Sequence, residues 1–399
     1  MIVLVNGLSV RSLSGEHVLL GHLRQLAGWT LGAHTFLLLH DRGQTSLLRQ
    51  LPANVRPACL SHSLASWSRR IAWETLLLPR LLRRWHVDMI FTTSGTVLPR
   101  CRVPQVSLAQ NPWCMVRRVH KGVVQKQKAV VQRYAYRQAM SRAALMIYNS
   151  GHMQELYREN AGGAIEQASQ VVYQAVDDSA HRQAARLQER IAKQPGLILC
   201  VSAMASWKGI EVLVDALALL HRRGCRAGLR LVGPWPDKRY ETMVRERIAT
   251  KGLGDYVSIT GKVTKNQLYR HYARAKVYCL MSHCESFGIP AVEAQAFGTP
   301  VVGSSVCAMP EICGPGGAFC RPDDTEQTAD LLQKLLEDSA HWIAMSDRAR
   351  KNAARFRWRT CSRPLLKMFQ SARPNEPEPE PPCQSTPRRD TALVEGRTV

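Results

Sequence analysis

The sequence predicts an α/β protein with two domains, each built on a parallel β-sheet. The chain has 399 residues, more than one hydrophobic core usually supports, and 45% of them are apolar. In both halves, strand-like apolar runs alternate with helix-length amphipathic segments. This alternation is typical of parallel sheets that helices cover on both faces.

The expected elements follow the same order in each half. In the first half, strands are expected at 2–6 (IVLVN), 35–40 (TFLLLH), 87–94 (VDMIFTTS), 104–111 (PQVSLAQN), 144–150 (ALMIYNS) and 170–176 (QVVYQAV), and helices at about 15–27, 67–88 and 121–142. In the second half, strands are expected at 197–203 (LILCVSA), 229–234 (LRLVGP), 257–263 (VSITGKV), 277–282 (VYCLMS), 299–305 (TPVVGSS) and 317–322 (GAFCRP).

A polar stretch between the two sets of strands predicts the domain boundary. The expected parts are an N-terminal domain at 1–175, a linker at 176–196, a C-terminal domain at 197–355, a helix at 356–370 that returns to the N-terminal domain, and a tail at 371–399. Proline and charge are so dense in this tail that it cannot bury a core, so we expect it to be disordered.

Basic residues outnumber acidic ones, mainly in the first half. The net charge is +23, and residues 1–190 alone hold 24 basic and 10 acidic side chains. Such charge attracts nucleic acid, anionic lipid or phosphorylated substrates, and charge alone does not distinguish them. The sequence has no RNA-binding motif or zinc module, so we expect no nucleic-acid partner.

Segment 67–88 suggests a contact with an anionic membrane surface. It places apolar side chains among five arginines, as in an amphipathic helix with a cationic rim, although a helix that covers a sheet has the same pattern. Apolar runs fall short of the roughly 20 residues that span a bilayer. The N-terminus MIVLVNGLSV resembles a first strand and not a signal peptide. We therefore expect a cytoplasmic protein, peripheral on the inner face of the cytoplasmic membrane.

The stretch HCESFGIPAVEAQAFGTPVVGS at 283–304 contains Glu285 and Glu293, with seven residues between them. Two carboxylates at a fixed spacing suggest a glycosidase pair, a metal site or a pair that binds hydroxyls. A helix is expected at 290–298, so the amides of 287–289 point into a cleft and favour an anion such as a diphosphate. The glutamates flank that anion site, and carboxylates accept hydrogen bonds from sugar hydroxyls.

These motifs resemble the retaining glycosyltransferases of family 4 (glycosyl transferases group 1), which have the GT-B fold of two facing Rossmann-like domains. The strongest match is ESFGIPAVEAQAFGTPVV, which fits the family's E-x7-E signature. Further matches are ASWKGIEVLVDAL, LRLVGP, MPEICGPGGAFCRPDD and, in the first half, SGEHVLLGHLRQLAGWT. The resemblance extends over about residues 1–370.

The resemblance implies a set of donor-binding residues around the E-x7-E motif. Glu293 would bind the nucleotide ribose, and Glu285 the transferred sugar. The amides of Phe287, Gly288 and Ile289 would bind the phosphates and the sugar.

Other implied residues lie on three further segments. Lys208 would neutralise the diphosphate leaving group, so the implied catalytic residues are Lys208 and Glu285. Gly15 matches the glycine loop of the opposite domain, with Ser14 in place of the usual second glycine. Val263 lies where backbone contacts to the base are typical.

Two positions depart from the family pattern. The arginine that usually accompanies the lysine is Ala203 here. Where many relatives have a histidine near the reaction centre, this chain has Asn111, which is either an acceptor contact or a turn residue before a proline.

The resemblance implies a transferase, of the hexosyltransferase type, that uses a UDP-, GDP- or ADP-sugar. The acceptor would be a cell-envelope polysaccharide or a lipid-linked oligosaccharide, as in lipopolysaccharide, O-antigen or exopolysaccharide biosynthesis. No metal or cofactor is implied. Because Ala203 replaces the arginine, the alternative is a catalytically weak homologue that binds sugar nucleotides or glycans.

Overall fold

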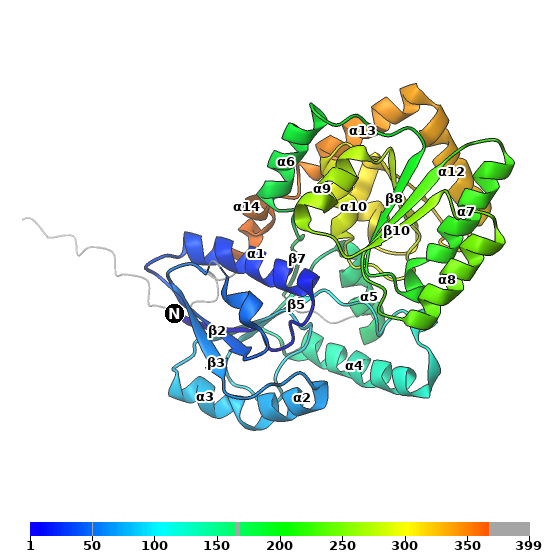
Figure 1. The fold of residues 1–399 in the computed structure, drawn as a ribbon. Coiled ribbons are helices and arrows are strands. Elements are labelled where there is room, and N and C mark those ends of the chain that lie inside the picture. The colour runs from blue at the N-terminus through cyan, green and yellow to red at the C-terminus, as the bar shows by residue number, and fades with distance from the viewer. Residues whose placement is uncertain (50, 164–167, 367–399) are drawn as a thin grey trace, which may run out of the picture.

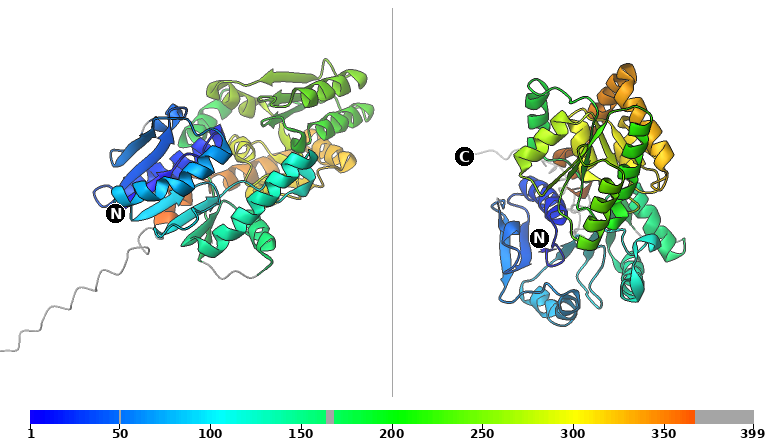
Figure 2. Two further views of the ribbon diagram at one scale, coloured as in Figure 1. Left: turned by 90° about the horizontal axis from the view of Figure 1, so that it is seen from below. Right: turned by 45° about the vertical axis from the view of Figure 1, so that its right-hand side comes forward.

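The computed structural model describes residues 1–49, 51–163 and 168–366, which form two α/β domains. Figure 1 shows the first domain in blue to cyan and the second in green to orange, and the two further views keep the same two-lobed arrangement (Figure 2). The expected disordered tail lies outside the described residues.

The first domain has a seven-stranded parallel sheet in the order β3-β2-β1-β4-β5-β6-β7. Its strands are β1 (Ile2–Asn6), β2 (Thr35–Asp41), β3 (Val55–Leu60), β4 (Met89–Thr92), β5 (Gln105–Ala109), β6 (Leu145–Tyr148) and β7 (Ser169–Val171). Its helices are α1 (Leu13–Trp29), α2 (Trp67–Leu76), α3 (Leu78–Arg84), α4 (Gly122–Arg142) and α5 (Gly151–Ala161), with short 3-10 turns η1 (Thr45–Leu48) and η2 (Arg117–Val119).

The second domain has a six-stranded parallel sheet in the order β10-β9-β8-β11-β12-β13. Its strands are β8 (Leu197–Val201), β9 (Gly228–Val232), β10 (Val257–Gly261), β11 (Val277–Leu280), β12 (Val301–Ser304) and β13 (Gly317–Cys320). The remaining helices and 3-10 turns are α6 (Asp178–Gln188), α7 (Ile210–Arg222), α8 (Lys238–Thr250), α9 (Lys265–Arg274), α10 (Ile289–Ala296), α11 (Met309–Cys313), α12 (Thr325–Glu337), α13 (Ser339–Ala353), α14 (Trp358–Cys361), η3 (Ser206–Lys208) and η4 (Gly314–Gly316).

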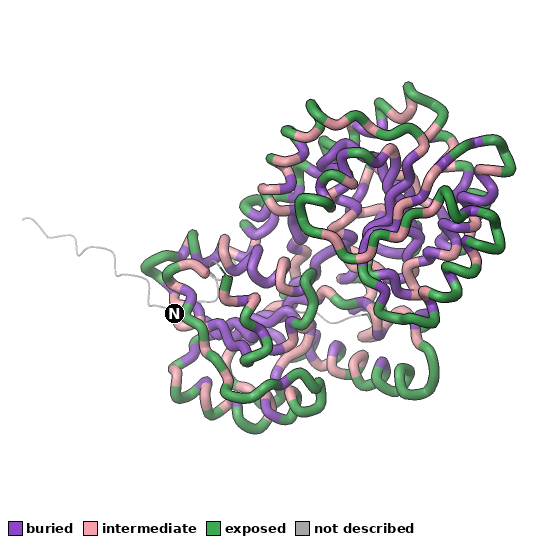
Figure 3. Tube along the Cα trace, in the orientation of Figure 1, coloured by how far each residue is buried: buried purple, intermediate pink, exposed green. Residues whose placement is uncertain are grey.

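Both sheets have the strand order of doubly wound folds, in which ligands bind at the carboxyl ends of the strands. The α/β class and the two-domain GT-B architecture predicted from the sequence are confirmed by this topology and by the structural neighbours described below. Buried strand residues fill the core of each domain (Figure 3).

The segment expected as a linker, 176–196, contains a helix. In α6, Ala180 and Ala184 are buried in the core of the second domain. A helix with small side chains on one face packs closely on a neighbouring element, so this segment forms part of the second domain as well as joining the two.

The C-terminal segment leaves the second domain and packs on α1. The ring of Trp358 lies over Gly21, where an added Cβ would approach ring atom Cζ2 to 2.2 Å, so only glycine leaves room for it. His22 Nδ1 and Ser362 Oγ are 2.9 Å apart, and Leu365 is buried in the core of the first domain. Figure 1 shows α14 beside α1.

The expected helix at 67–88 is two helices, α2 and α3. Pro79 lies at the start of α3, where the lack of its N–H costs nothing because the first amides of a helix have no intrahelical partner. Trp73, Leu78 and Leu82 are buried against strand residues, so these helices cover the sheet.

Candidate functional site

A cavity of about 590 Å³ lies between the two domains, a size typical of small-molecule sites. Its first-domain wall includes the loop before α1, the start of α1, the segments that follow β4 and β5, and side chains of α2 and α4. Its second-domain wall consists of the segments that follow β8 and β11, with the N-terminus of α10. The residues that line the cavity include Arg11, Gly15, Arg70, Thr93, Asn111, Ala203, Lys208, Glu285, Phe287, Gly288 and Ile289.

The N-terminus of α10 presents unpaired amides to this cavity. Gly288 caps the helix with a φ of +91°, a left-handed conformation, and an added Cβ would approach Met309 Sδ to 2.8 Å. Among the described residues, the amides of Phe287, Gly288 and Ile289 donate no hydrogen bond. Together with the helix dipole, these amides form a binding position for an anion.

Lys208 and Glu285 form an ion pair at the edge of this anion position. Lys208 ends η3, and Gly209 follows with a φ of +64°, where an added Cβ would approach the carbonyl oxygen of Met281 to 2.3 Å. Burial by itself would lower the pKa of Lys208, but the charge of Glu285 and its hydrogen bond outweigh burial and raise this pKa. Lys208 is therefore a cation at neutral pH, held in place by Glu285.

The loop that carries Glu285 is tied to the first domain through Ser286. Asn149 Nδ2 donates to Ser286 Oγ at 3.0 Å, and Ser150 Oγ donates to the Ser286 carbonyl at 2.8 Å. Glu311 accepts hydrogen bonds from the amides of Gly151 and His152 at 2.7 and 2.9 Å, at the N-terminus of α5. The two domains thus meet directly beside the E-x7-E motif.

Gly15, the expected donor-side glycine, and Asn111, the expected acceptor contact or turn residue, both lie on the first-domain wall of the cavity. The amide of Gly15 donates to Ser12 Oγ at 3.1 Å, the N-cap bond of α1. Asn111 Oδ1 accepts a hydrogen bond from the amide of Trp113 at 3.1 Å, which is the turn interaction considered above.

Glu293 and Val263 are not among the residues that line the cavity. Glu293 Oε2 accepts a hydrogen bond from Tyr272 Oη at 2.9 Å, and burial raises the pKa of Glu293. Val263 packs against the core of the second domain. The structure thus brings Lys208, Glu285 and the α10 amides together, and places the expected ribose and base positions outside this lining.

The sequence did not single out Arg11 or Arg70 as site residues. Arg11 lies in the loop before α1, and Arg70 belongs to the expected cationic rim of segment 67–88, but both line the cavity. Ala203, which replaces the arginine of the family pattern, lies on the second-domain wall of the cavity. Among the described residues, no group of three or more His, Cys, Asp and Glu side chains gathers as a metal site.

Residues 181–356 match the model of the family described as glycosyl transferases group 1. This match spans almost the whole of the second domain. This chain is 31% identical over 181 residues to the MMP alpha-(1->4)-mannosyltransferase of Mycolicibacterium hassiacum, and the aligned region covers 44% of this chain and 43% of that protein. It is 32% identical over 178 residues to the O-antigen chain mannosyltransferase B of Escherichia coli, and this aligned region covers 44% of this chain and 45% of that protein. The chain thus matches less than half the length of these two relatives.

The whole fold resembles solved structures that share little sequence with this chain. The sucrose-phosphate synthase of Thermosynechococcus elongatus has a TM-score of 0.74 at 17% identity, covering 93% of this chain and 98% of that one. HepE of Anabaena, solved in complex with UDP and glucose, has a TM-score of 0.68 at 21% identity and covers 93% and 100%. These neighbours extend the likeness beyond the glycosyl transferases group 1 domain to the fold of the first domain.

Proposed function

We propose that this protein is a retaining glycosyltransferase. It moves a sugar from a nucleotide-sugar donor to a cell-envelope polysaccharide or a lipid-linked oligosaccharide. The observation that carries the proposal is the ion pair of Lys208 and Glu285 beside the free amides of α10, in a cavity between two domains. The relatives named as mannosyltransferases support transfer of a sugar, and the neighbour solved with UDP supports a nucleoside diphosphate donor.

Each residue in this arrangement has a distinct chemical task. The amides of Phe287, Gly288 and Ile289 bind the diphosphate, whose negative charge grows as the bond to the sugar breaks. The Lys208 ammonium has three N–H donors, so the bond to Glu285 leaves two for phosphate oxygens. Glu285 accepts hydrogen bonds from the hydroxyls of the transferred sugar. Glu293 is the proposed ribose ligand and Val263 the proposed backbone contact to the base, and both require the donor to extend past the cavity lining.

Thermal unfolding with UDP-, GDP- and ADP-sugars tests donor binding. A ligand at about 100 times its dissociation constant raises the free energy of unfolding by about 2.7 kcal/mol, so one nucleotide class should shift the midpoint clearly. Release of nucleoside diphosphate in the presence of cell-envelope acceptors then tests transfer. Binding without release of nucleoside diphosphate would leave a sugar-nucleotide binding protein instead of a transferase.

Matched charge variants show whether turnover depends on this site. Lys208→Ala and Glu285→Gln should each lower the turnover rate by about tenfold or more, because each removes a charged contact to the donor. Lys334→Ala and Glu246→Gln remove the same charges from exposed positions of the same domain and should leave the rate unchanged. Equal rates in all four variants would contradict the proposal.

We infer that the first domain also binds an anionic membrane surface, through α4 as well as α2. Five apolar side chains of α4 are 53–78% exposed: Val123, Val124, Val130, Val131 and Tyr134. The helix has five basic residues and no acidic one, and its outer part is exposed in Figure 3. An apolar strip between cations suits the boundary between lipid headgroups and acyl chains. In the described part of the chain, every helix is too short or too polar to cross a membrane.

Vesicle sedimentation tests this surface. Phosphatidylglycerol vesicles should bind the protein at low salt and release it at high salt, because salt screens the attraction between charges. Val124→Asp with Val131→Asp should weaken binding, whereas Ile343→Asp, at an exposed apolar position of the second domain, should not. Failure to bind at low salt would refute the membrane contact.

A further inference from the structure

The charges around the interdomain cavity are unevenly compensated. Of the charged residues that line it, three are cations (Arg11, Arg70 and Lys208) and one, Glu285, is a carboxylate. Lys208 is paired with Glu285, as described above. Whether each arginine brings net positive charge to the cavity depends on how closely it is paired with a carboxylate, Asp41 for Arg11 and Glu74 for Arg70.

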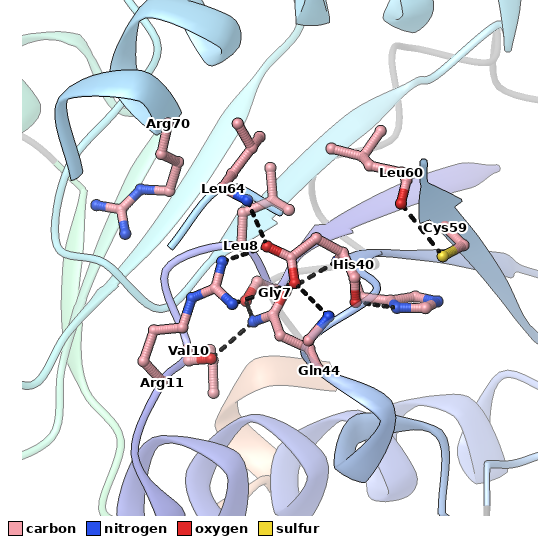
Figure 4. A network of polar contacts seen from close by, with 12 residues as sticks. Gly7, Leu8, Val10, Arg11, His40, Gln44, Cys59, Leu60, Leu64 and Arg70 are labelled. Carbon is pink, nitrogen blue, oxygen red and sulfur yellow. Dashed lines mark hydrogen bonds and ion pairs between the residues drawn. The ribbon is translucent and has the colours of Figure 1, made fainter. Parts of the chain in front are cut away.

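Arg11 is compensated by Asp41. Its guanidinium donates two parallel hydrogen bonds to Asp41, at 3.1 and 2.5 Å, and the Asp41 side chain is wholly buried. Burial would raise the pKa of Asp41, but Arg11 and the amides of Leu64 and Gly43 outweigh it and lower this pKa. Figure 4 shows this network, in which Gln44 also donates to two carbonyls of the loop before α1. Arg11 therefore shapes the wall and brings little net charge to the cavity.

Arg70 has a weaker partner, Glu74, with which it forms an ion pair without a hydrogen bond. Its Nε lies 3.8 Å from Glu74 Oε2, too far for a hydrogen bond, and this buried nitrogen has no hydrogen-bond partner among the described residues. Glu74 Oε1 instead accepts from Asn6 Nδ2 at 2.8 Å, and burial raises the pKa of Glu74. In Figure 4, Arg70 stands apart from the contacts around Arg11. Its side chain is 19% exposed, so this positive charge has little access to water.

The wall around Arg70 offers further hydrogen-bonding groups. Thr93 lines the cavity and is 3% exposed, yet its hydroxyl has no hydrogen-bond partner among the described residues. Ser9, Ser94 and Gln110 line the same wall. A mostly buried guanidinium and an unsatisfied hydroxyl that line the same cavity are the kinds of donor that an oxyanion requires.

We propose that this wall binds an oxyanion, a phosphate or a carboxylate, that is part of the acceptor, with Arg70 as its cation. The inference rests on the proposed transferase function. It assigns the anion to the acceptor because Arg70 belongs to α2 of the first domain, whereas the diphosphate position at α10 and Lys208 belongs to the second. The acceptor is thus an acidic or phosphorylated glycan, and Arg70 selects for it.

Titration calorimetry on the full chain, saturated with the nucleoside diphosphate that stabilises it, tests the proposal. The probes are glucose, glucose 6-phosphate and glucuronic acid. At least one anionic probe should bind about tenfold or more tightly than glucose, as expected for one charge-assisted contact, and comparison of the two distinguishes phosphate from carboxylate. Arg70→Gln should remove this preference, Arg70→Lys should keep part of it, and the exposed neighbour Arg69→Gln should keep all of it.

The outcomes separate the two proposals. Equal binding of all three probes to the unaltered protein, or a preference that survives in Arg70→Gln, would overturn the acceptor assignment. Loss of nucleotide affinity in Arg70→Gln would also overturn it, because Arg70 would then serve the donor diphosphate. If no nucleoside diphosphate stabilises the protein at all, the proposed transferase function itself fails.

Discussion

Removal of either partner from the Lys208–Glu285 pair should destabilise the protein by an amount set by the burial of the pair. The two side chains are 14% and 15% exposed, so water screens their attraction only in part. Breaking a buried pair costs about 3–5 kcal/mol, because the remaining charge is left without a partner. The residual exposure brings the expected loss for Lys208→Met or Glu285→Gln to about 2–3 kcal/mol.

The double variant separates the pair from its two members. Lys208→Met with Glu285→Gln leaves no unpaired charge, so its loss should be no larger than that of either single variant. The resulting coupling free energy is about 2 kcal/mol, well inside the range seen for residues in contact.

Urea and thermal unfolding of the four proteins measure this coupling. Each kcal/mol corresponds to roughly 2–4 °C in domains of about 150–250 residues, so the single variants should unfold at least 4 °C lower. Added UDP or GDP should stabilise Glu285→Gln more than Lys208→Met, because the diphosphate supplies the missing negative charge to Lys208. Additive losses, with the double variant the least stable, would refute the ion pair as an energetic unit.

Two further predictions concern positions near and far from the cavity. Gly209→Ala should lower both stability and turnover, because its Cβ would approach the Met281 carbonyl oxygen to 2.3 Å. Gly224 also has a positive φ, but an added Cβ there would meet nothing within 4 Å. Gly224→Ala should therefore cost only about 1 kcal/mol, for its backbone conformation. Burial, and to a smaller extent the neighbouring His17, lower the pKa of His22 from 6.5 to about 3. Between these two pH values His22 is protonated in the unfolded chain and neutral in the folded one. The free energy of unfolding should therefore decrease as the pH is lowered below about 6.5, by about 2 kcal/mol at pH 5. In urea unfolding across this range, His22→Gln should depend less on pH than the unaltered protein, and an identical pH dependence would contradict the assignment.

Most of the fold was predictable because the parallel strands are buried on both faces and therefore appear as continuous apolar runs. The edge strand β3 (Val55–Leu60) was missed, since it contains Arg56 and Pro57, and proline is tolerated mainly at sheet edges. Helix α5 was also missed. Its N-terminus is stabilised by Ser150 and by Glu311 of the other domain, a contact that no local pattern reveals.

The helix and turn on the second-domain side of the cavity were predictable for a local reason. Helix α10 and the turn at Gly288 are encoded within a few consecutive residues, so the anion position follows from the sequence. The first-domain wall is different, since Arg70 is paired with Glu74, Glu74 is held by Asn6 of another element, and Thr93 lines the same cavity from a third. In the sequence, Arg70 is one of several arginines on an amphipathic segment, and only the fold separates it from its exposed neighbour Arg69.

The contacts of Ser286 link these two sides. Its hydroxyl and carbonyl are held by Asn149 and Ser150 of the first domain, while its chain neighbours Glu285 and Phe287 line the donor side. A rotation of one domain against the other would therefore have to break hydrogen bonds at the residue next to the Lys208–Glu285 pair. Since the proposed transfer requires the sugar hydroxyls, the diphosphate and the acceptor to be aligned at once, the geometry of the proposed donor position depends on how the first domain, which carries Arg70, is seated against it.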